Sequence, residues 1–314
     1  MNIRRVAVAG TGMMGPGIAA IFALAGCEAT IVSRTNENAA RGVAKARALI
    51  DQLVANHLVE PPQGNAAQPR LVGSTDTEGV TRSAELFVES IAENLAVKQD
   101  YFARLDRAAP DTILCSNTSG ISITQIAAKC AKPERVLTTH FWNPPHLMPL
   151  VEVVMGNATD ATIAKGVVEF LRAAGKVPVL VRKDRPGQLG NRFHNALIRE
   201  CISIVEEGIA TAEDVDLAIK TGMGLRFPVY GIFEHVDLVG LDLAQAVQDY
   251  VLPDLSAIQR AGPLLRDKVA KGEVGARASK GFLEWTPQKA EQVRERRDRF
   301  LMHVLRWQKE GKAE

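Results

Sequence analysis

The stretch Val6-Ala7-Val8-Ala9-Gly10-Thr11-Gly12-Met13-Met14-Gly15 decides the fold of the first half of this chain. It joins a short apolar strand to glycines at the GxGxxG spacing, and residues 16–24 continue as an apolar helix with a proline in its first turn. In such a unit Gly10 permits a tight turn, Gly12 lets a phosphate approach the backbone, and Gly15 lets the helix pack closely on the strand. The motif therefore predicts a dinucleotide-binding fold, with the helix N-terminus facing the phosphates. The candidate cofactor contacts in this turn are Gly10, Gly12, Met13, Met14 and Gly15.

The first half of the sequence continues as an alternation of apolar strands and helical segments. Residues 36–58 predict a long helix, and the prolines and glycine between residues 61 and 69 predict a loop. Further strands are expected at residues 29–32, 86–91, 112–115, 135–139, 151–154 and 177–181. This alternation predicts an α/β fold, a Rossmann-type doubly wound parallel sheet.

The second half of the sequence changes character after Lys183-Asp184-Arg185-Pro186-Gly187. Helical periodicity then dominates, with one long helix expected over residues 188–208 and another, dense in Arg and Glu, over residues 287–308. The charges of the last helix are interpreted as solvated intrahelical ion pairs, and a binding surface is the alternative. We therefore predict a dinucleotide-binding domain over residues 1–184 and an all-helical C-terminal domain over residues 185–314.

The composition is that of an ordinary globular protein and excludes several classes of partner. The 314 residues include 38 basic and 36 acidic side chains, so the net charge of +2 gives no broad reason to expect nucleic acid or a membrane surface as partner. The four cysteines have neither a CxxC nor a zinc-ligand spacing, so no metal site or disulfide framework is expected. Arg4-Arg5 before an apolar run superficially resembles a secretory signal, but glycines and Pro16 interrupt it. We expect a cytoplasmic protein.

The end of the second predicted strand, Ser33-Arg34-Thr35, bears on the choice of dinucleotide. An acidic residue there would accept a hydrogen bond from the ribose 2′-hydroxyl of NAD, and none is present. Ser33, Arg34 and Thr35 could instead hold the 2′-phosphate of NADP, because the Arg34 guanidinium offers a planar fork of donors. We expect NAD or NADP as cofactor, with NADP favoured. The alternative is that Arg34 stacks on adenine while NAD binds.

Three later segments predict the chemistry: Ser116-Asn117-Thr118-Ser119, His140-Phe141-Trp142-Asn143-Pro144-Pro145, and Glu152. Oxidation of a secondary alcohol releases a hydroxyl proton as hydride leaves carbon, and a histidine can take that proton near neutral pH. Glu152 lies in an apolar strand, where a carboxylate normally requires a partner, and His140 is the partner we expect. The sequence thus predicts a nicotinamide-dependent alcohol dehydrogenase with a histidine as acid and base.

The motifs together resemble the L-3-hydroxyacyl-CoA dehydrogenase family, including its relatives that act on free hydroxy acids, such as lambda-crystallin and carnitine dehydrogenase. The resemblance covers nearly the whole chain and several motifs in one order. Besides the glycine turn and the segments above, they are Glu93-Asn94-Leu95 with Lys98, Leu150-Val151-Glu152, Pro186-Gly187 and Asn191-Arg192. So many motifs make the assignment more specific than the glycines alone.

The resemblance implies roles for individual residues. It makes His140 the acid and base, Glu152 the carboxylate that orients its ring, and Ser119 and Asn191 the ligands of the substrate oxygen. It places Glu93 and Lys98 near the nicotinamide ribose. Asn117 and Asn143 could line the cofactor cleft through their amides, and the alternative is that they make turns after the strands. For Glu93 and Lys98 the alternative is a surface ion pair at a helix start. It also implies a homodimer formed through the helical domain.

The substrate is left open between two classes. A 3-hydroxyacyl-CoA of fatty acid metabolism is the family default, and a free hydroxy acid is the alternative. Pro145-His146-Leu147-Met148-Pro149 departs from the acyl-CoA pattern, and residues 51–68 offer no Lys or Arg for coenzyme A phosphates. Arg226 could bind a substrate carboxylate, or pair with Asp237 instead. A non-catalytic cofactor-binding protein is a third, less favoured interpretation.

Overall fold

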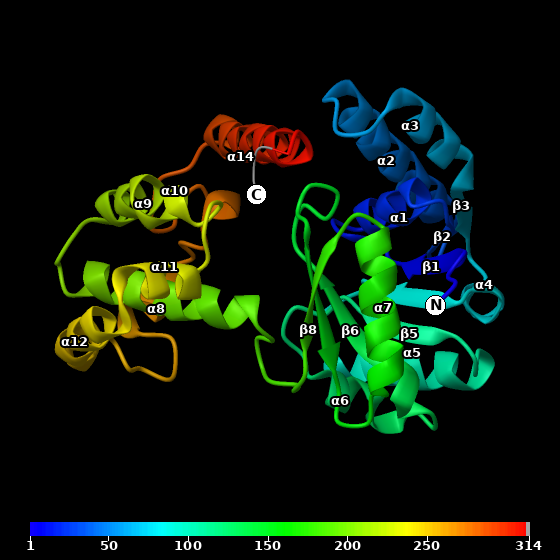
Figure 1. Ribbon diagram of the computed structural model, residues 1–314, viewed down its shortest axis with the longest axis horizontal. Coiled ribbons are helices and arrows are strands. Elements are labelled where there is room, and N and C mark those ends of the chain that lie inside the picture. The colour runs from blue at the N-terminus through cyan, green and yellow to red at the C-terminus, as the bar shows by residue number, and fades with distance from the viewer. Residues whose placement is uncertain (312–314) are drawn as a thin grey trace. The chain divides into compact units, whose positions relative to one another are not determined.

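The computed structural model describes residues 1–311, which form two compact units. The first unit comprises Met1–Arg192 and Leu301–Lys309, and the second comprises Phe193–Phe300 together with Glu310 and Gly311. Residues 185–192 therefore cluster with the first unit, although the sequence assigned them to the helical domain. Figure 1 shows the strands in the first unit and mainly helices in the second.

The first unit is built on one eight-stranded sheet with the order β3-β2-β1-β4-β5-β6-β7-β8. Its strands are β1 Arg5–Ala9, β2 Glu28–Val32, β3 Leu71–Ser74, β4 Leu86–Glu89, β5 Ile113–Ser116, β6 Val136–Phe141, β7 Leu150–Met155 and β8 Val177–Val181. Strands β1 to β6 are parallel and their order reverses beside β1, so the predicted doubly wound α/β fold is confirmed.

The last two strands differ from the predicted parallel arrangement. β7 pairs with β6 in the antiparallel direction and with β8 in the parallel direction, so β7 and β8 run against the rest of the sheet. The connection between β6 and β7 spans only residues 142–149. A parallel crossover needs about a dozen residues or more, so this short connection requires the strand to reverse.

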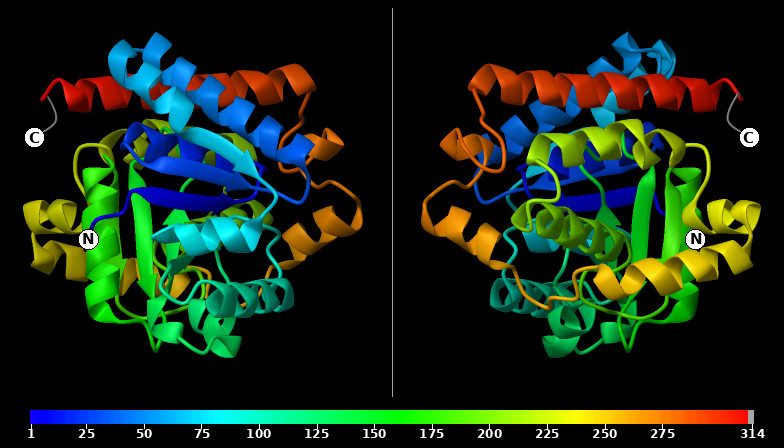
Figure 2. Two further views of the ribbon diagram at one scale, coloured as in Figure 1. Left: turned by 90° about the vertical axis from the view of Figure 1, so that its right-hand side faces the viewer. Right: turned by 90° about the vertical axis from the view of Figure 1, so that its left-hand side faces the viewer.

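Helices pack on both faces of the sheet (Figure 2). Those of the first unit are α1 Gly15–Leu24, α2 Asn36–Ala55, α3 Pro61–Ala67, α4 Thr77–Ser83, α5 Leu95–Ala108, α6 Ile123–Ile126 and α7 Ala161–Ala173. Along β1, Val6 and Val8 pack with α1, α2 and α7, while Ala7 and Ala9 pack with α5 and α6. A strand buried on both faces reads as a continuous apolar run, which is what the sequence has here.

The predicted loop over residues 61–69 is wrong, because residues 61–67 form helix α3. The prolines occupy its first turn, where the missing N–H would have no helical partner. Gly64 lets α3 approach α2, since a Cβ there would lie 2.5 Å from the Val54 Cγ2 atom. The sequence also gave no sign of β3, a four-residue edge strand in which Gly73 packs against Ala39.

The second unit consists mainly of helices, as the periodicity predicted. They are α8 Gly190–Glu206, α9 Ala212–Thr221, α10 Met223–Arg226, α11 Ile232–Val239, α12 Leu241–Val251, α13 Pro263–Ala270 and α14 Pro287–Lys309, of which α8 begins and α14 ends in the first unit. Within α14, Arg294 pairs with Glu291 at 2.8 Å, as expected of an intrahelical ion pair. None of the helices in residues 1–311 is long and apolar enough to cross a membrane.

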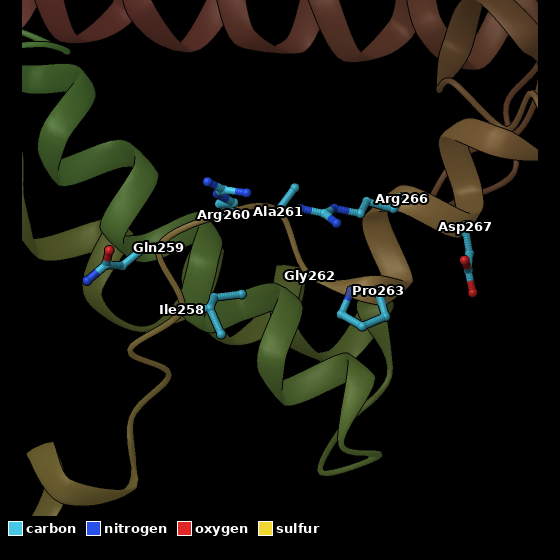
Figure 3. Close-up of a pocket in the computed structure, with 8 residues that line it drawn as sticks. All are labelled: Ile258, Gln259, Arg260, Ala261, Gly262, Pro263, Arg266 and Asp267. Atoms are coloured by element: carbon cyan, nitrogen blue, oxygen red, sulfur yellow. The ribbon is translucent and has the colours of Figure 1, made fainter.

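An open pocket of about 590 Å³ lies in the second unit around the start of α13 (Figure 3). Its lining is Ile258, Gln259, Arg260, Ala261, Gly262, Pro263, Arg266 and Asp267. Leu264 at the start of this helix donates its backbone N–H to the Glu206 carboxylate at 2.9 Å. A side chain of the same chain thus already satisfies this helix end, and none of the predicted site residues lines the pocket.

Candidate active site

In the glycine-rich turn between β1 and α1, the surroundings of Gly10, Gly12 and Gly15 match the roles expected of them. Gly10 has a φ of +116°, and a Cβ at this position would lie 2.2 Å from the Ser90 carbonyl oxygen. A Cβ on Gly15 would lie 1.9 Å from the Gly10 carbonyl oxygen, so the helix start requires glycine for close packing. Nothing lies within 4 Å of the corresponding position on Gly12. That open surface fits a dinucleotide phosphate, which needs close approach to the backbone.

In the segment after β2, Ser33 and Thr35 already form hydrogen bonds within the protein. The Thr35 hydroxyl accepts a hydrogen bond from the Asn38 backbone N–H at 3.2 Å and so caps helix α2. The Ser33 backbone N–H donates to the Ser74 carbonyl oxygen at 3.0 Å. Arg34 is exposed and forms no ion pair within residues 1–311. Its guanidinium therefore remains available to a ligand at this end of the sheet.

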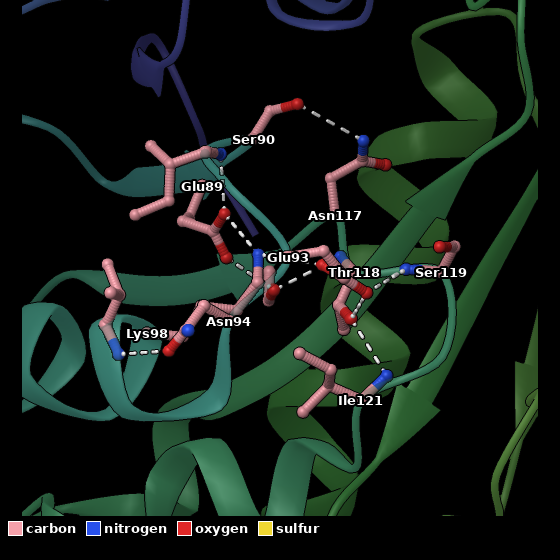
Figure 4. Close-up of polar contacts among 12 residues, drawn as sticks. Glu89, Ser90, Glu93, Asn94, Lys98, Asn117, Thr118, Ser119 and Ile121 are labelled. Carbon is pink, nitrogen blue, oxygen red and sulfur yellow. Dashed lines mark hydrogen bonds and ion pairs between the residues drawn. The ribbon is translucent and has the colours of Figure 1, made fainter.

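A buried ion pair supports the region after β4 and β5 (Figure 4). The Lys98 Nζ atom lies 2.5 Å from the Glu89 carboxylate and 3.3 Å from that of Glu93. Side-chain exposure is 1% for Lys98 and 0% for Glu89, so the surface-pair alternative for Lys98 is wrong. The Ser116 hydroxyl and the Ile91 backbone N–H also donate to Glu89, at 2.6 Å and 2.7 Å. Sequence reasoning missed Glu89, although it ends an apolar strand.

Glu93 lies partly exposed above this pair and is fixed by several donors. The Thr118 hydroxyl and the Ser119 backbone N–H both donate to its Oε1 atom. Partial burial acts to raise the pKa of Glu93, but the Thr118 hydrogen bond and the nearby Lys98 charge outweigh burial and lower the pKa. Glu93 is therefore an ionised acceptor at neutral pH, held beside Ser119 where β5 ends.

His140 and Glu152 form a buried cross-strand pair. They lie directly opposite each other in the antiparallel register of β6 and β7, so their side chains point to the same face. The His140 Nδ1 atom lies 2.7 Å from Glu152 Oε2, and the side chains are 9% and 0% exposed. The structure thus brings together the two residues that the sequence expected to be partners. The reversal of β7 is what puts them opposite each other.

Glu152 accepts hydrogen bonds from four donors. His140 and the Trp142 indole N–H share its Oε2 atom, the latter at 3.0 Å. The backbone N–H groups of Leu189 and Gly190 donate to Oε1 at 2.8 Å and 2.9 Å, at the start of α8. Burial acts to raise the pKa of Glu152, but the four hydrogen bonds outweigh it and lower the pKa to about 2. Glu152 is therefore a carboxylate throughout the neutral range. Sequence reasoning missed the last three donors.

A cavity of about 330 Å³ collects most of the predicted site residues. Its lining is Met14, Asn117, Ser119, His140, Phe141, Trp142, Asn143 and Asn191. The Asn117 amide oxygen accepts from the Phe141 backbone N–H at 2.8 Å, and the Asn191 amide donates to the Ser119 carbonyl oxygen at 2.7 Å. These bonds tie the ends of β5, β6 and the start of α8 together around the histidine.

Arg226 is not among the residues that line this cavity. Arg226 ends helix α10 in the second unit, is exposed, and forms no ion pair with Asp237 in the described part of the chain. Within residues 1–311 no group of three or more His, Cys, Asp or Glu side chains could hold a metal ion. The cavity lining itself offers an imidazole, a hydroxyl, an indole and three amide groups.

Comparison with known proteins agrees with this geometry. The NAD-binding domain of 3-hydroxyacyl-CoA dehydrogenase matches residues 5–185, and the C-terminal domain of the same family matches residues 187–285. Human mitochondrial hydroxyacyl-coenzyme A dehydrogenase is 35% identical, over 90% of this chain and 91% of its own length. The 5-formyl-3-hydroxy-2-methylpyridine 4-carboxylate 5-dehydrogenase of Mesorhizobium japonicum is 32% identical, over 97% and 98%.

Solved structures give the same result. A crystal structure of the 5-formyl-3-hydroxy-2-methylpyridine 4-carboxylic acid dehydrogenase, described as an NAD⁺-dependent dismutase, superposes with a TM-score of 0.91 at 31% identity, covering 99% of this chain and 100% of its own. The (S)-3-hydroxybutyryl-CoA dehydrogenase of Ralstonia eutropha superposes with a TM-score of 0.76 at 31% identity, over 91% and 100%. The predicted resemblance is confirmed, and this chain belongs to the 3-hydroxyacyl-CoA dehydrogenase family of NAD-dependent oxidoreductases.

Proposed function

We propose that this protein interconverts a 3-hydroxyacyl-CoA, or a related 3-hydroxy acid, and the 3-oxo compound. NAD, when bound, supplies the hydride acceptor. The observation that carries the proposal is the His140–Glu152 pair, whose histidine lines the same cavity as Ser119 and Asn191. A base, an orienting carboxylate and two polar side chains around one cavity are what removal of a hydroxyl proton requires.

His140 is the proposed acid and base. Its Nδ1 atom is engaged by Glu152, so Nε2 is the ring nitrogen that can exchange a proton with the substrate hydroxyl. The proton passes to Nε2 as the C–H bond of the alcohol breaks, and the imidazolium that forms is stabilised by the ionised Glu152. In the reverse direction the same imidazolium returns the proton to the 3-oxo oxygen.

Ser119 and Asn191 are proposed to hold the substrate oxygen. The backbone of Ser119 is fixed at both ends, because its N–H donates to Glu93 and its carbonyl oxygen accepts from Asn191. Its side chain lines the cavity with His140. A hydroxyl on so constrained a backbone can align the reacting carbon without further ordering.

The proposed cofactor site runs from the glycine turn to the ends of β4, β5 and β6. The turn residues Gly10, Gly12, Met13, Met14 and Gly15 would contact the phosphates, and Glu93, Asn117 and Asn143 the nicotinamide end. Lys98, whose side chain is buried, would act there through Glu93. Ser33, Arg34 and Thr35 support the further proposal that NADP is accepted and favoured. Turnover with each cofactor, in the native protein and in Arg34→Ala, tests that proposal. A strong NAD preference that Arg34→Ala retains would contradict it.

The reaction itself is tested by initial rates of reduced-cofactor formation. L-3-hydroxybutyryl-CoA and free L-3-hydroxybutyrate are compared, each with NAD and NADP. Faster turnover of the thioester supports an acyl-CoA substrate. Cofactor binding without turnover of any hydroxy acid would favour a non-catalytic protein instead.

A free carboxylic acid is the second candidate substrate, and a specific observation favours it. The relative with a TM-score of 0.91 is named for a free pyridine carboxylic acid, and it matches nearly the whole of this chain. The absence of Lys and Arg in residues 51–68 agrees with a substrate that has no coenzyme A phosphates. Arg226, which is exposed, is the proposed partner of the substrate carboxylate. Arg226→Gln should then raise KM for the free acid more than for an ester of the same acid.

We further propose a homodimer in a reducing compartment, the cytoplasm. Support for the dimer comes from apolar side chains of the second unit that are largely exposed, such as Phe233 at 85% and Leu238 at 79%. The four cysteines are free thiols, which fits a reducing compartment. Sedimentation as a monomer at micromolar concentration would contradict the dimer.

A further inference from the structure

The Trp142 indole contacts the proposed acid–base pair of His140 and Glu152. Its Nε1–H donates to Glu152 Oε2 at 3.0 Å, and His140 Nδ1 lies 2.7 Å from the same oxygen. The indole and imidazole rings are 5.8 Å apart at an angle of 50°. One carboxylate oxygen therefore divides its acceptor capacity between a group that changes charge and a group that does not.

Gly190 provides the space that the indole occupies. A Cβ on Gly190 would lie 2.3 Å from Trp142 Cζ2 and 3.1 Å from Cη2. The φ of Gly190 is outside the left-handed region, so the indole rather than the backbone conformation requires glycine here. The Gly190 N–H also donates to the other oxygen of Glu152. Trp142 and Gly190 thus lie against each other, and each donates a hydrogen bond to a different oxygen of Glu152.

We propose that Trp142 is a positioning residue for His140, acting through Glu152, and that Gly190 is its matched partner. This inference rests on the proposed acid–base reaction. The indole N–H fixes the orientation of the carboxylate and withdraws part of its acceptor strength from the imidazole. Trp142 thereby keeps His140 from being held too firmly as the imidazolium, which cannot act as the base for alcohol oxidation.

The direct test follows the His140 ring by NMR in the native protein and in Trp142→Phe. The Cε1–H signal of His140, identified by its loss in His140→Gln, is recorded against pH. Without the indole N–H, Glu152 becomes a stronger acceptor for His140 alone, and the midpoint of the titration should move upward by about half a pH unit or more. This readout needs no turnover, so it remains informative if the proposed reaction is wrong.

An isosteric replacement separates the hydrogen bond from the ring. Replacing Trp142 with 3-benzothienylalanine keeps the bicyclic shape and puts sulfur where the N–H was. We expect the same upward shift as in Trp142→Phe, with thermal stability close to that of the native protein. An unshifted titration in this variant would overturn the proposal, because the ring without its donor would then suffice.

A double-mutant cycle tests the partnership with Gly190. Gly190→Ala alone should displace the indole and reproduce the upward shift, since the added Cβ has no room beside Cζ2. In the Trp142→Phe background the same substitution should add little, because phenylalanine lacks the second ring. Where turnover is measurable, the acid limb of kcat/KM should follow the NMR titration. Simple additivity of the two substitutions would overturn the partnership.

Discussion

Glu89 and Glu152 are both completely buried, and they differ in the kind of cation beside them. Glu89 ends β4 and faces the Lys98 ammonium group, the Ser116 hydroxyl and one backbone N–H. Glu152 lies within β7 and faces the His140 imidazole, the Trp142 indole and two backbone N–H groups. At both sites several hydrogen-bond donors surround the carboxylate, as its burial requires.

The difference between the two sites separates structure from chemistry. An ammonium group stays charged across the neutral range, so the Glu89–Lys98 pair can hold β4, β5 and α5 together but cannot move a proton. An imidazole changes its charge near neutral pH, so the Glu152–His140 pair can accept and return one. Substitutions at the first site should act mainly on stability, whereas substitutions at the second should also act on turnover.

The largest expected effect is that of His140→Gln. Loss of the only proposed acid and base should lower kcat by about 10³-fold, within the range known for general acid–base catalysis. Glutamine can still donate to Glu152, so folding and cofactor binding should change little. Steady-state kinetics gives the first quantity, and titration of cofactor fluorescence gives the second. Near-normal turnover would remove His140 from the reaction and erase the contrast between the sites.

Lys98→Met should act in the opposite way. It leaves Glu89 buried without its cation, and loss of one member of such a pair lowers the free energy of unfolding by about 3–5 kcal/mol. The proposed contact of Glu93 with cofactor should also weaken, since Lys98 lies 3.3 Å from Glu93. Urea denaturation measures the first effect.

The matched control for Lys98→Met is the double variant that adds Glu89→Gln. Removal of both charges should recover most of the lost stability, because no unpaired charge remains in the interior. A double variant as unstable as Lys98→Met would show that packing of the lysine stem, rather than the charge, holds this region.

The two sites were not equally predictable from the sequence. His140 and Glu152 could be paired because each lies in an apolar strand, where a polar side chain requires a polar partner. The direction of β7 was not predictable from its residues, because an apolar run has the same pattern whichever way the strand runs. Glu89 was missed because its partner Lys98 comes from the helix that follows β4, and an apolar strand ending in Glu does not by itself say which cation covers it.

Segments distant in sequence account for the rest of what could not be predicted. Gly190 needs to be glycine because of an indole from residue 142, and Leu189 donates to a carboxylate from residue 152. No pattern of neighbouring residues in the sequence predicts such contacts. The glycine turn was predictable for the contrary reason: Gly10 and Gly15 contact each other within a few residues. The error at α3 was also local, since prolines were interpreted as loop residues when they begin a helix.

Acid should weaken the native protein more than the variant Glu152→Gln. The pKa of Glu152 is lowered from 4.5 to about 2, so its contribution to stability is complete above pH 4.5 and is lost as the pH falls toward 2. This contribution is on the order of 3 kcal/mol. The difference in unfolding free energy between native protein and Glu152→Gln should therefore shrink between pH 6 and pH 3. A difference that is constant over this range would mean that the carboxylate is not specially stabilised.

The smallest expected effect comes from removing one neutral donor from each carboxylate, which is the same chemical change at both sites. Ser116→Ala removes a hydroxyl that donates to Glu89 at 2.6 Å, and it should lower the free energy of unfolding by about 1–2 kcal/mol. The pH dependence of turnover should stay as it is, because the lost hydroxyl has no contact with the proposed acid–base pair. Trp142→Phe removes the donor at 3.0 Å from Glu152, where one of the remaining partners, His140, can change its charge. A shift of the pH profile in Trp142→Phe but not in Ser116→Ala would show which group decides whether a buried site takes part in proton transfer. That group would be the cation rather than the carboxylate. A shift in both would mean that the Glu89 network also reaches the reacting proton.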